Sequence, residues 1–316
     1  MQWADRIGRR LKLRDLHILL TVVERGSMAK AAAELAISQP AVSKAITDLE
    51  YMFGLRLLDR GRGGIEPTAY GHALVARGRV IFDELKQGID EVAFLADPSA
   101  AELHIGSTES IAAGFLPAVI KDFSQEQPRV RLNVAQAVIS KLHYRELRER
   151  SIDLMLGRIP TPFKEADLKA EVVYDDQVVV VAGRRSKWAR ARKLELADLS
   201  GERWILPPAD TMHGSLTTEL FGASGTDLPR APVTTLSIHL CCQLVATTRF
   251  VTMLPASIIR HGNHDRSLKV LPIRLPAQPR PVAIVTLKNR ALSPAAKLFI
   301  ESVRRTARLD GKGSIP

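Results

Sequence analysis

The segment AISQPAVSKAITDLE holds a proline near the start of an otherwise helical pattern. Ser38 is a good N-cap, so Pro40 falls in the first turn, where its missing N–H removes no intrahelical hydrogen bond. Val42, Ile46 and Leu49 recur at i, i+4 and i+7, which predicts that this face packs inward. The opposite face carries short polar side chains and one lysine. The segment therefore predicts a helix with a packed face and a free polar face.

Two further helical patterns precede this segment. Leu13 to Glu24 has apolar residues at helical spacing, and the Ala-rich stretch MAKAAAELA follows a cap at Ser27. A tight turn then leads into the helix described above. Two short helices joined in this way are typical of a helix-turn-helix DNA-binding motif. The alternative is an ordinary amphipathic helix whose solvated side happens to be polar.

A glycine turn containing arginine follows the third helix. LRLLDR and GIEPT flank GRGG, which predicts a two-stranded wing beside the helix-turn-helix. We expect Gln39 and Ser43 to reach base edges, while Lys44 and the wing arginines contact phosphates. The residues predicted to contact DNA are Ser38, Gln39, Pro40, Ser43, Lys44, Thr47, Arg60 and Arg62.

Thr68 can cap a long helix that ends near Ala96, before Asp97 and Pro98. An apolar seam at near-heptad spacing runs along this helix and consists of Leu74, Ile81, Leu85, Ile89, Val92 and Leu95. Such a seam favours a dimerisation helix over a lone surface helix.

Beyond Pro98, strand and helix patterns alternate. LHIGST, VRLNVAQ, IDLMLG, VVYDDQVVVVAG, RWILP and FVTML are typical of strands, with helical stretches such as GFLPAVIKDFSQE and LHYRELRER between them. This alternation predicts a doubly wound α/β fold with parallel sheets and helices on both faces. The length allows two lobes, and PVAIVTLK with the helix after it can return the chain to the first lobe. Two crossings would then form a hinged cleft.

Composition narrows the choice of partner and compartment. The 316 residues carry a formal net charge of +11, which favours a polyanion such as nucleic acid or an anionic lipid surface. The N-terminal residues lack an uninterrupted apolar signal region, so export is not expected. The two cysteines, Cys241 and Cys242, are adjacent and form no disulfide framework, which favours a reducing cytoplasm. They are either small buried residues or a redox-sensing pair.

The block GSMAKAAAELAISQPAVSKAITDLEYMFGLRLLDR, with Thr68 and Gly71 after it, resembles the LysR-type transcriptional regulators. The resemblance implies a winged helix-turn-helix, a linker helix that pairs two chains, and a two-lobed effector domain like periplasmic solute-binding proteins. It further implies a homodimer or homotetramer on promoter double-stranded DNA. A small-molecule effector would change how this assembly bends DNA or contacts RNA polymerase.

The resulting domain prediction has five parts. An N-terminal extension spans 1–12, the winged helix-turn-helix 13–72, the linker helix 68–97, the effector domain 101–305 and a tail 306–316. Within the effector domain, the first lobe is expected to comprise 101–173 and 274–305, and the second lobe 174–273.

The effector residues are predicted in part from the residues and in part from the resemblance. In IGSTES, Ser107, Thr108 and Ser110 follow a strand and precede a helix, so they can hold an anion or simply cap that helix. Matching to the family places Ser110 and Ser140 at ligand contacts. It also places four residues of the second lobe in cleft segments: Thr211, Ser215, Ser237 and His239.

Other chemistry finds little support in the sequence. His261 and His264 lack partners with metal-ligand spacing, and no catalytic motif is present, so neither a cofactor nor enzymatic activity is expected. The basic run 183–193 is either a solvated loop or a contact with DNA or a neighbouring subunit. The rival hypotheses are a solute-binding module, a doubly wound α/β enzyme, and a ligand-independent regulator with a vestigial cleft. The sequence does not identify the effector or the promoter, and it does not distinguish an activator from a repressor.

Overall fold

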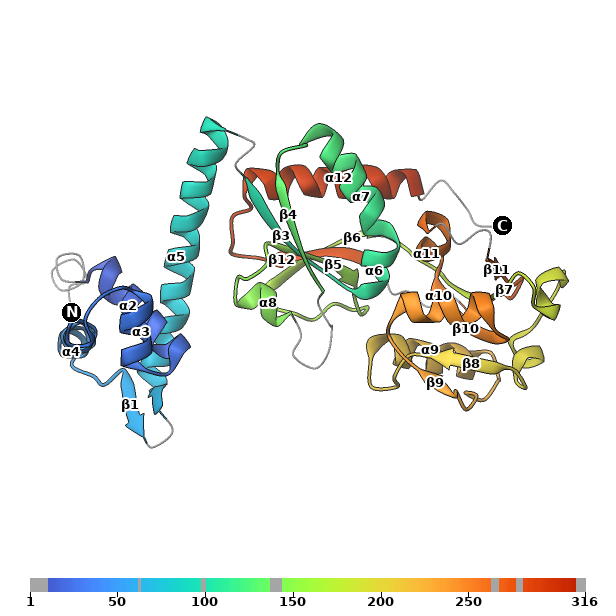
Figure 1. Cartoon of the computed structure of the whole chain (residues 1–316), viewed down its shortest axis with the longest axis horizontal. Coiled ribbons are helices and arrows are strands. Elements are labelled where there is room, and N and C mark those ends of the chain that lie inside the picture. The colour runs from blue at the N-terminus through green and yellow to red at the C-terminus, as the bar shows by residue number, and fades with distance from the viewer. Residues whose placement is uncertain are drawn as a thin grey trace. The chain divides into compact units, whose positions relative to one another are not determined.

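The computed structural model describes residues 11–61, 64–97, 101–136, 144–262, 267–276 and 281–310. The chain divides into two compact units, residues 1–89 and residues 90–316 (Figure 1). Each unit has its own hydrophobic core. None of the helices in the described part of the chain is long and apolar enough to span a membrane.

The first unit begins with three helices: α2 (Leu13–Arg25), α3 (Met28–Glu34) and α4 (Gln39–Phe53). Ser27 caps α3 by accepting a hydrogen bond from the Lys30 N–H at 3.5 Å. Ser38 caps α4 in the same way, from the Ala41 N–H at 3.4 Å, and Pro40 lies in the first turn. The predicted helix-turn-helix and both of its caps are confirmed.

The core of this unit is formed by the inner faces of the same helices. Leu19 and Val42 are fully buried, and Leu16, Ile46 and Leu49 are 1% exposed. Each such side chain contributes roughly 1.5–3 kcal/mol through burial. The predicted division of α4 into a packed and a free face follows from this burial.

The predicted wing is present as β1 (Leu58–Gly61) and β2 (Gly64–Pro67), which pair antiparallel. The Glu50 carboxylate on α4 accepts hydrogen bonds from the N–H groups of Leu57 and Leu58, at 2.8 and 3.2 Å. A Cβ at Gly71 would lie 2.0 Å from the Leu57 carbonyl oxygen, so only glycine fits there. The wing is thus anchored both to α4 and to the helix that follows it.

The long helix α5 (Ala69–Ala96) begins at the predicted cap, because Thr68 Oγ1 accepts a hydrogen bond from the Gly71 N–H at 3.1 Å. Leu74 packs against the core of the first unit. The other residues of the predicted seam are 42–78% exposed and comprise Ile81, Leu85, Ile89, Val92 and Leu95.

The second unit contains two five-stranded sheets. The first sheet has the order β4-β3-β5-β12-β6, and we call it with its helices the first lobe. Its strands are β3 (Glu102–Ser107), β4 (Arg131–Gln136), β5 (Leu154–Arg158), β6 (Leu168–Tyr174) and β12 (Val282–Leu287). Its helices are α6 (Glu109–Ala113), α7 (Phe115–Glu126), α8 (Arg145–Arg148) and α12 (Pro294–Asp310).

The second sheet has the order β11-β7-β10-β8-β9, and with its helices it forms the second lobe. Its strands are β7 (Val178–Gly183), β8 (Arg203–Leu206), β9 (Val233–Thr234), β10 (Phe250–Pro255) and β11 (Leu268–Val270). The helices are α9 (Met212–Ala223), α10 (Ile238–Thr247) and α11 (Ala256–His261), with short 3₁₀ turns η2 (Lys187–Arg190) and η3 (Leu196–Leu199).

Two expectations about the sheets were wrong. Both sheets are mixed rather than parallel: β12 runs antiparallel to β5 and β6, and β7 runs antiparallel to β10 and β11. VVYDDQVVVVAG is not one strand, because β6 ends at Tyr174 and β7 starts at Val178 in the other sheet. The chain crosses between the lobes here and again between β11 and β12. The antiparallel strands follow from these crossings, since β7 and β12 each enter a sheet from the opposite lobe.

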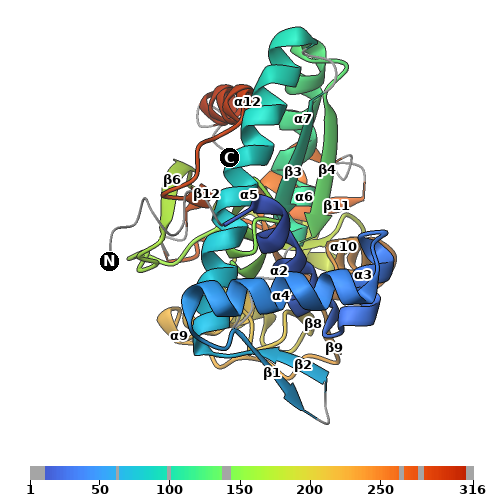
Figure 2. The ribbon, with the colours of Figure 1, turned by 90° about the vertical axis from the view of Figure 1, so that its left-hand side faces the viewer.

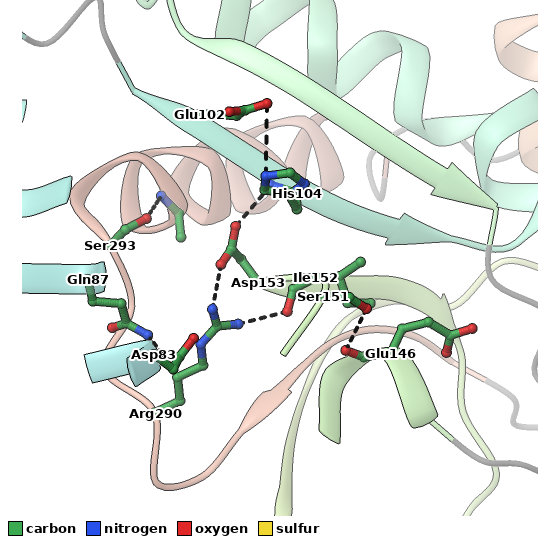
Figure 3. A network of polar contacts seen from close by, with 11 residues as sticks. Asp83, Gln87, Glu102, His104, Glu146, Ser151, Ile152, Asp153, Arg290 and Ser293 are labelled. Carbon is green, nitrogen blue, oxygen red and sulfur yellow. Dashed lines mark hydrogen bonds and ion pairs between the residues drawn. The ribbon is translucent and has the colours of Figure 1, made fainter. Parts of the chain in front are cut away.

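A polar network closes one end of the first sheet (Figure 3). Asp153 accepts a hydrogen bond from the His104 N–H at 2.9 Å and pairs with the Arg290 guanidinium at 2.9 Å. Arg290 also donates to the carbonyl oxygen of Ile152 at 2.7 Å. This network ties the loop after β12 to the start of β5 and fixes the register of three strands.

Candidate DNA-contacting face and effector cavity

The outer face of α4 is free in the first unit. In Figure 2, α4 crosses the front of this unit and the β1–β2 wing lies below it. Gln39, Pro40, Lys44 and Thr47 are exposed, and Ser43 is half-buried on the same helix. These polar residues therefore remain available to a partner.

Two of the predicted contact residues also have a local structural role. Ser38 is exposed, but its hydroxyl oxygen is used as the N-cap of α4. The Thr47 hydroxyl donates to the Ser43 carbonyl oxygen at 2.9 Å and keeps its acceptor lone pairs free. Arg60 lies in β1, where its backbone alone is described, and Arg62 lies outside the described residues.

Sequence reasoning missed Tyr51 on the same helix. Its side chain is 82% exposed, and it lies at i+4 from Thr47 and i+7 from Lys44. The signal was present, because an aromatic residue on the polar stripe of an amphipathic helix breaks the pattern. A phenolic hydroxyl at this position can donate to a phosphate.

The second unit contains a cavity of about 260 Å³ between its two lobes. The ends of β4 and β5 and the start of α6 line it from the first lobe. The ends of β8 and β10 and the starts of α9 and α10 line it from the second. Its polar lining residues include Thr108, Ser110, Gln136, Arg158, Thr211, His213, Thr217, Thr235 and Thr252. Apolar residues such as Leu206, Leu216, Met253 and Leu254 form much of the remaining wall.

Three of the predicted effector residues line this cavity: Thr108, Ser110 and Thr211. Ser110 Oγ lies 3.3 Å from His213 Nε2, so a hydrogen bond across the cavity joins α6 of the first lobe to α9 of the second. Thr211 caps α9 by accepting a hydrogen bond from the Gly214 N–H at 3.0 Å. The cavity thus brings together polar groups from both lobes.

The other predicted effector residues that the structure describes do not line the cavity. Ser107 is fully buried and donates to the Thr108 carbonyl oxygen at 3.2 Å. Ser215 donates to the Met212 carbonyl oxygen, and Ser237 caps α10. The remaining two are His239, which is exposed on α10, and Ser140, which lies outside the described residues.

A buried ion pair connects the cavity to the crossing between the lobes. Arg158, at the end of β5, lines the cavity, and its guanidinium lies 3.1 Å from the carboxylate of Asp176 in the first crossing. The Ser257 hydroxyl and N–H on α11 both donate to the same carboxylate, at 2.7 and 3.0 Å. A Cβ at Gly114 would lie 2.8 Å from Ser257 Oγ, so α6 and α11 are in close contact here. One carboxylate therefore links both lobes and the crossing.

Sequence reasoning also missed Arg158 and His213. A charged residue that ends the apolar run IDLMLGR signals a buried partner, and this was the available clue for Arg158. His213 lies within the predicted cleft segment Thr211 to Ser215, but its approach to Ser110 depends on residues about one hundred positions apart.

The two cysteines are both buried on α10. Burial raises the pKa of each thiol to about 11. A thiol that stays protonated at neutral pH is a poor nucleophile, so the arrangement favours small buried residues over a redox pair.

His261 ends α11 and its ring packs at an edge against Phe115, while His264 lies outside the described residues. Within the described ranges, no cluster of three or more His, Cys, Asp or Glu residues could hold a metal ion.

Comparison with known proteins decides between the remaining hypotheses. The family model for the LysR substrate binding domain matches residues 96–308, and that for the bacterial regulatory helix-turn-helix protein of the lysR family matches residues 13–72. The chain belongs to the LysR family. This LysR regulator is a ligand-responsive, DNA-binding transcriptional regulator and not an enzyme.

Relatives of this LysR regulator match it along nearly the whole chain. It is 28% identical to the regulator GbpR of Azospirillum brasilense, over 93% of this chain and 86% of that protein. It is 26% identical to the dual regulator GltC of Bacillus subtilis, over 93% and 96% of the two chains.

Solved structures show the same fold. A full-length OxyR variant from Pseudomonas aeruginosa matches with a TM-score of 0.64 at 20% identity, over 95% of both chains. CbnR, a LysR family regulator, matches with a TM-score of 0.60 at 21% identity, over 94% of this chain and 99% of that one.

Proposed function

We propose that α4 lies in the major groove of promoter DNA, with Gln39 and Ser43 contacting base edges. The exposed polar face of α4, opposite its buried face, carries this proposal. Amide and hydroxyl groups can hydrogen-bond base edges, whereas the Lys44 ammonium suits a phosphate. Ser38, Pro40, Thr47 and Tyr51 flank these contacts, and Arg60 and Arg62 of the wing contact the adjacent backbone.

A second copy of the chain pairs along α5. Five apolar residues of this helix remain exposed, from Ile81 to Leu95, and burying them against an identical helix removes that surface from water. The pair holds two α4 helices at a fixed separation. Dimers can assemble further into tetramers, and RNA polymerase is a further partner of the DNA-bound assembly in the cytoplasm.

The cavity between the lobes takes a small metabolite with one anionic group and an apolar body. Of the described residues that line it, Arg158 is the single lysine or arginine, and its side chain is 96% buried. Thr108, Ser110 and His213 lie around the same cavity and supply hydrogen bonds to a carboxylate. The apolar wall excludes water from the rest of the ligand.

Ligand binding changes how the two lobes are held together. Ser110 and His213 bridge the cavity, so a ligand between them replaces a direct contact between lobes with contacts to itself. An anion beside Arg158 also competes with Asp176 for the guanidinium. A ligand that favours one lobe arrangement shifts the population toward it and alters the spacing of the DNA-binding units.

A thermal-shift screen of small carboxylates tests the effector site. We expect at least one to raise the melting temperature of the wild-type protein, since a ligand at 100 times its Kd stabilises by about 2.7 kcal/mol. Ser110→Ala should lower the affinity for that ligand, measured by calorimetry, and leave the affinity for DNA unchanged. Ser224→Ala, a matched serine on the far end of α9, should bind it normally. Unchanged ligand affinity in Ser110→Ala would remove Ser110 from the site.

A further inference from the structure

The second lobe carries a dense cluster of positively charged side chains. Residues 174–273, the expected second lobe, contain 12 Lys and Arg against 9 Asp and Glu, a net charge of +3. Residues 1–97, which contain the DNA-binding unit, hold 14 Lys and Arg against 13 Asp and Glu, a net charge of +1. The helix-turn-helix therefore does not account for the total of +11.

Much of this charge gathers at one end of the second sheet. There β7 ends and β8, β10 and β11 begin, because Gly183 pairs with Leu268 and Phe250 pairs with Arg203. The basic run after β7, together with Arg203 and the residue before β10, thus comes from three chain segments to one place. We call this set the basic end, and it comprises Arg184, Arg185, Lys187, Arg190, Arg192, Lys193, Arg203 and Arg249, all exposed.

Few of these cations are neutralised within the part of the chain that the structure describes. Lys187 pairs with Glu202 at 2.7 Å, and the Arg203 guanidinium lies 4.4 Å from the Phe250 ring centroid. Glu195 and Asp198, the nearby acids on η3, are engaged in a capping box. The remaining arginines and Lys193 make no ion pair among the described residues. A solvated loop usually mixes both signs of charge, whereas here eight cations stand against the three acids Glu195, Asp198 and Glu202.

The basic end is separate from the effector cavity. Val178, Leu206 and Pro255, which line the cavity, lie at the opposite ends of β7, β8 and β10. A six-residue strand such as β10 spans about 17 Å, so an effector in the cavity does not reach these cations. In Figure 1 the loop after β7 lies at the end of the second lobe that faces away from the first lobe.

We propose that the basic end binds the phosphate backbone of DNA as a second, sequence-independent contact surface. Six of its eight cations are arginines, whose planar guanidinium matches phosphate oxygens, and contacts to phosphates carry no direct sequence information. DNA is already the ligand of this family, and its local concentration is high once α4 is bound. Backbone contacts by the second lobe extend the bound length of DNA and link the lobe arrangement to its path.

The test measures DNA binding as a function of salt in the full chain. The triple variant R190Q, R192Q and K193Q removes three exposed cations, and the matched control K121Q, R129Q and R131Q removes three from the first lobe. With about 0.9 counterions released per phosphate contact, the slope of log affinity against log salt should become shallower by about 2.7 per chain. The loss of affinity should then be about 40-fold larger at 50 mM than at 200 mM salt.

A duplex trimmed to the footprint of the DNA-binding units supplies the second arm. On this short duplex the triple variant should bind with the same affinity as the wild type. On a long duplex the triple variant should bind more weakly than the wild type, and the control variant should not. Equal slopes for the triple variant and the control on the long duplex would overturn the proposal. An equal loss on both duplexes would also overturn it, by placing the effect in the units that read the site. Loss of binding to anionic phospholipid vesicles with an unchanged DNA slope would assign the surface to a membrane instead.

Discussion

The substitution Asp176→Ala tests how the two lobes of the effector domain are joined. The Asp176 carboxylate is 1% exposed and serves both the Arg158 guanidinium and two donors of Ser257. Removing it leaves a buried cation without this carboxylate and frees the two Ser257 donors. Breaking a buried pair by removing one partner costs about 3–5 kcal/mol. This loss of free energy destabilises the contact between the two lobes rather than the pairing of strands within either sheet.

The effect can be followed by thermal unfolding. For a unit of about 200 residues, 1 kcal/mol shifts the melting temperature by about 2–4 °C, so a drop of about 6–20 °C is expected. Tryptophan fluorescence reports on unfolding of the second unit, because Trp204 is fully buried in the second lobe and Trp188 packs on the same core. The neighbouring Asp175→Ala is the control, since Asp175 is exposed and a surface change of this kind is worth within about 0.5 kcal/mol.

A second readout separates stability from binding. In Asp176→Asn the amide keeps the shape of the side chain but not its charge, so an anion in the cavity gains Arg158 as a partner. We expect the carboxylate found in the screen to bind more tightly to Asp176→Asn than to the wild type, measured by calorimetry. A melting temperature of Asp176→Ala within 2 °C of the control would refute the reasoning that this carboxylate holds the lobes together.

Two further predictions concern the cysteines and α5. Because burial raises the pKa of Cys241 and Cys242 to about 11, fewer than about one thiol in a thousand is ionised at pH 7.5, and neither should react with an alkylating reagent until denaturant is added. Rapid labelling of the native protein, read by mass spectrometry, would contradict this. Leu85→Glu with Ile89→Glu should convert the proposed dimer to monomer in sedimentation velocity, since charges replace exposed apolar residues that the proposal places between two α5 helices. Lys86→Glu, an exposed change on the same helix, should leave the oligomer intact, and an intact double variant would move the interface elsewhere.

The DNA-binding unit could be predicted from sequence because its determinants are local. Ser38 and Pro40 define the start of α4, Val42 and Ile46 define its packed face, and the glycine turn defines the wing. Each of these signals lies within a few residues of the structure it specifies. The position of the wing against α4 depends on the Glu50 carboxylate, and no local sequence pattern predicts that this side chain accepts a hydrogen bond from Leu57.

The effector domain was predicted less completely, since its site is assembled over long sequence separations. Ser110 meets His213, and Arg158 meets Asp176, only after the chain has crossed between the sheets. The polar residues Asp175 and Asp176 inside an apolar run were the clue to that crossing, and reading the run as one strand concealed it. Strand direction was equally inaccessible, because a strand has the same periodicity in a parallel and an antiparallel sheet.

The central claim is that α4 reads bases through Gln39 and positions itself on phosphates through Lys44. The most direct measurement compares Gln39→Ala and Lys44→Ala on the promoter site and on a full set of its single base-pair substitutions. Gln39→Ala should lose about 1–3 kcal/mol of discrimination at one or two base pairs and keep its salt slope. Lys44→Ala should weaken all sites evenly and make the slope shallower by about 0.9 per chain. A Gln39→Ala profile parallel to that of the wild type, at every base pair, would contradict the placement of this face in the groove.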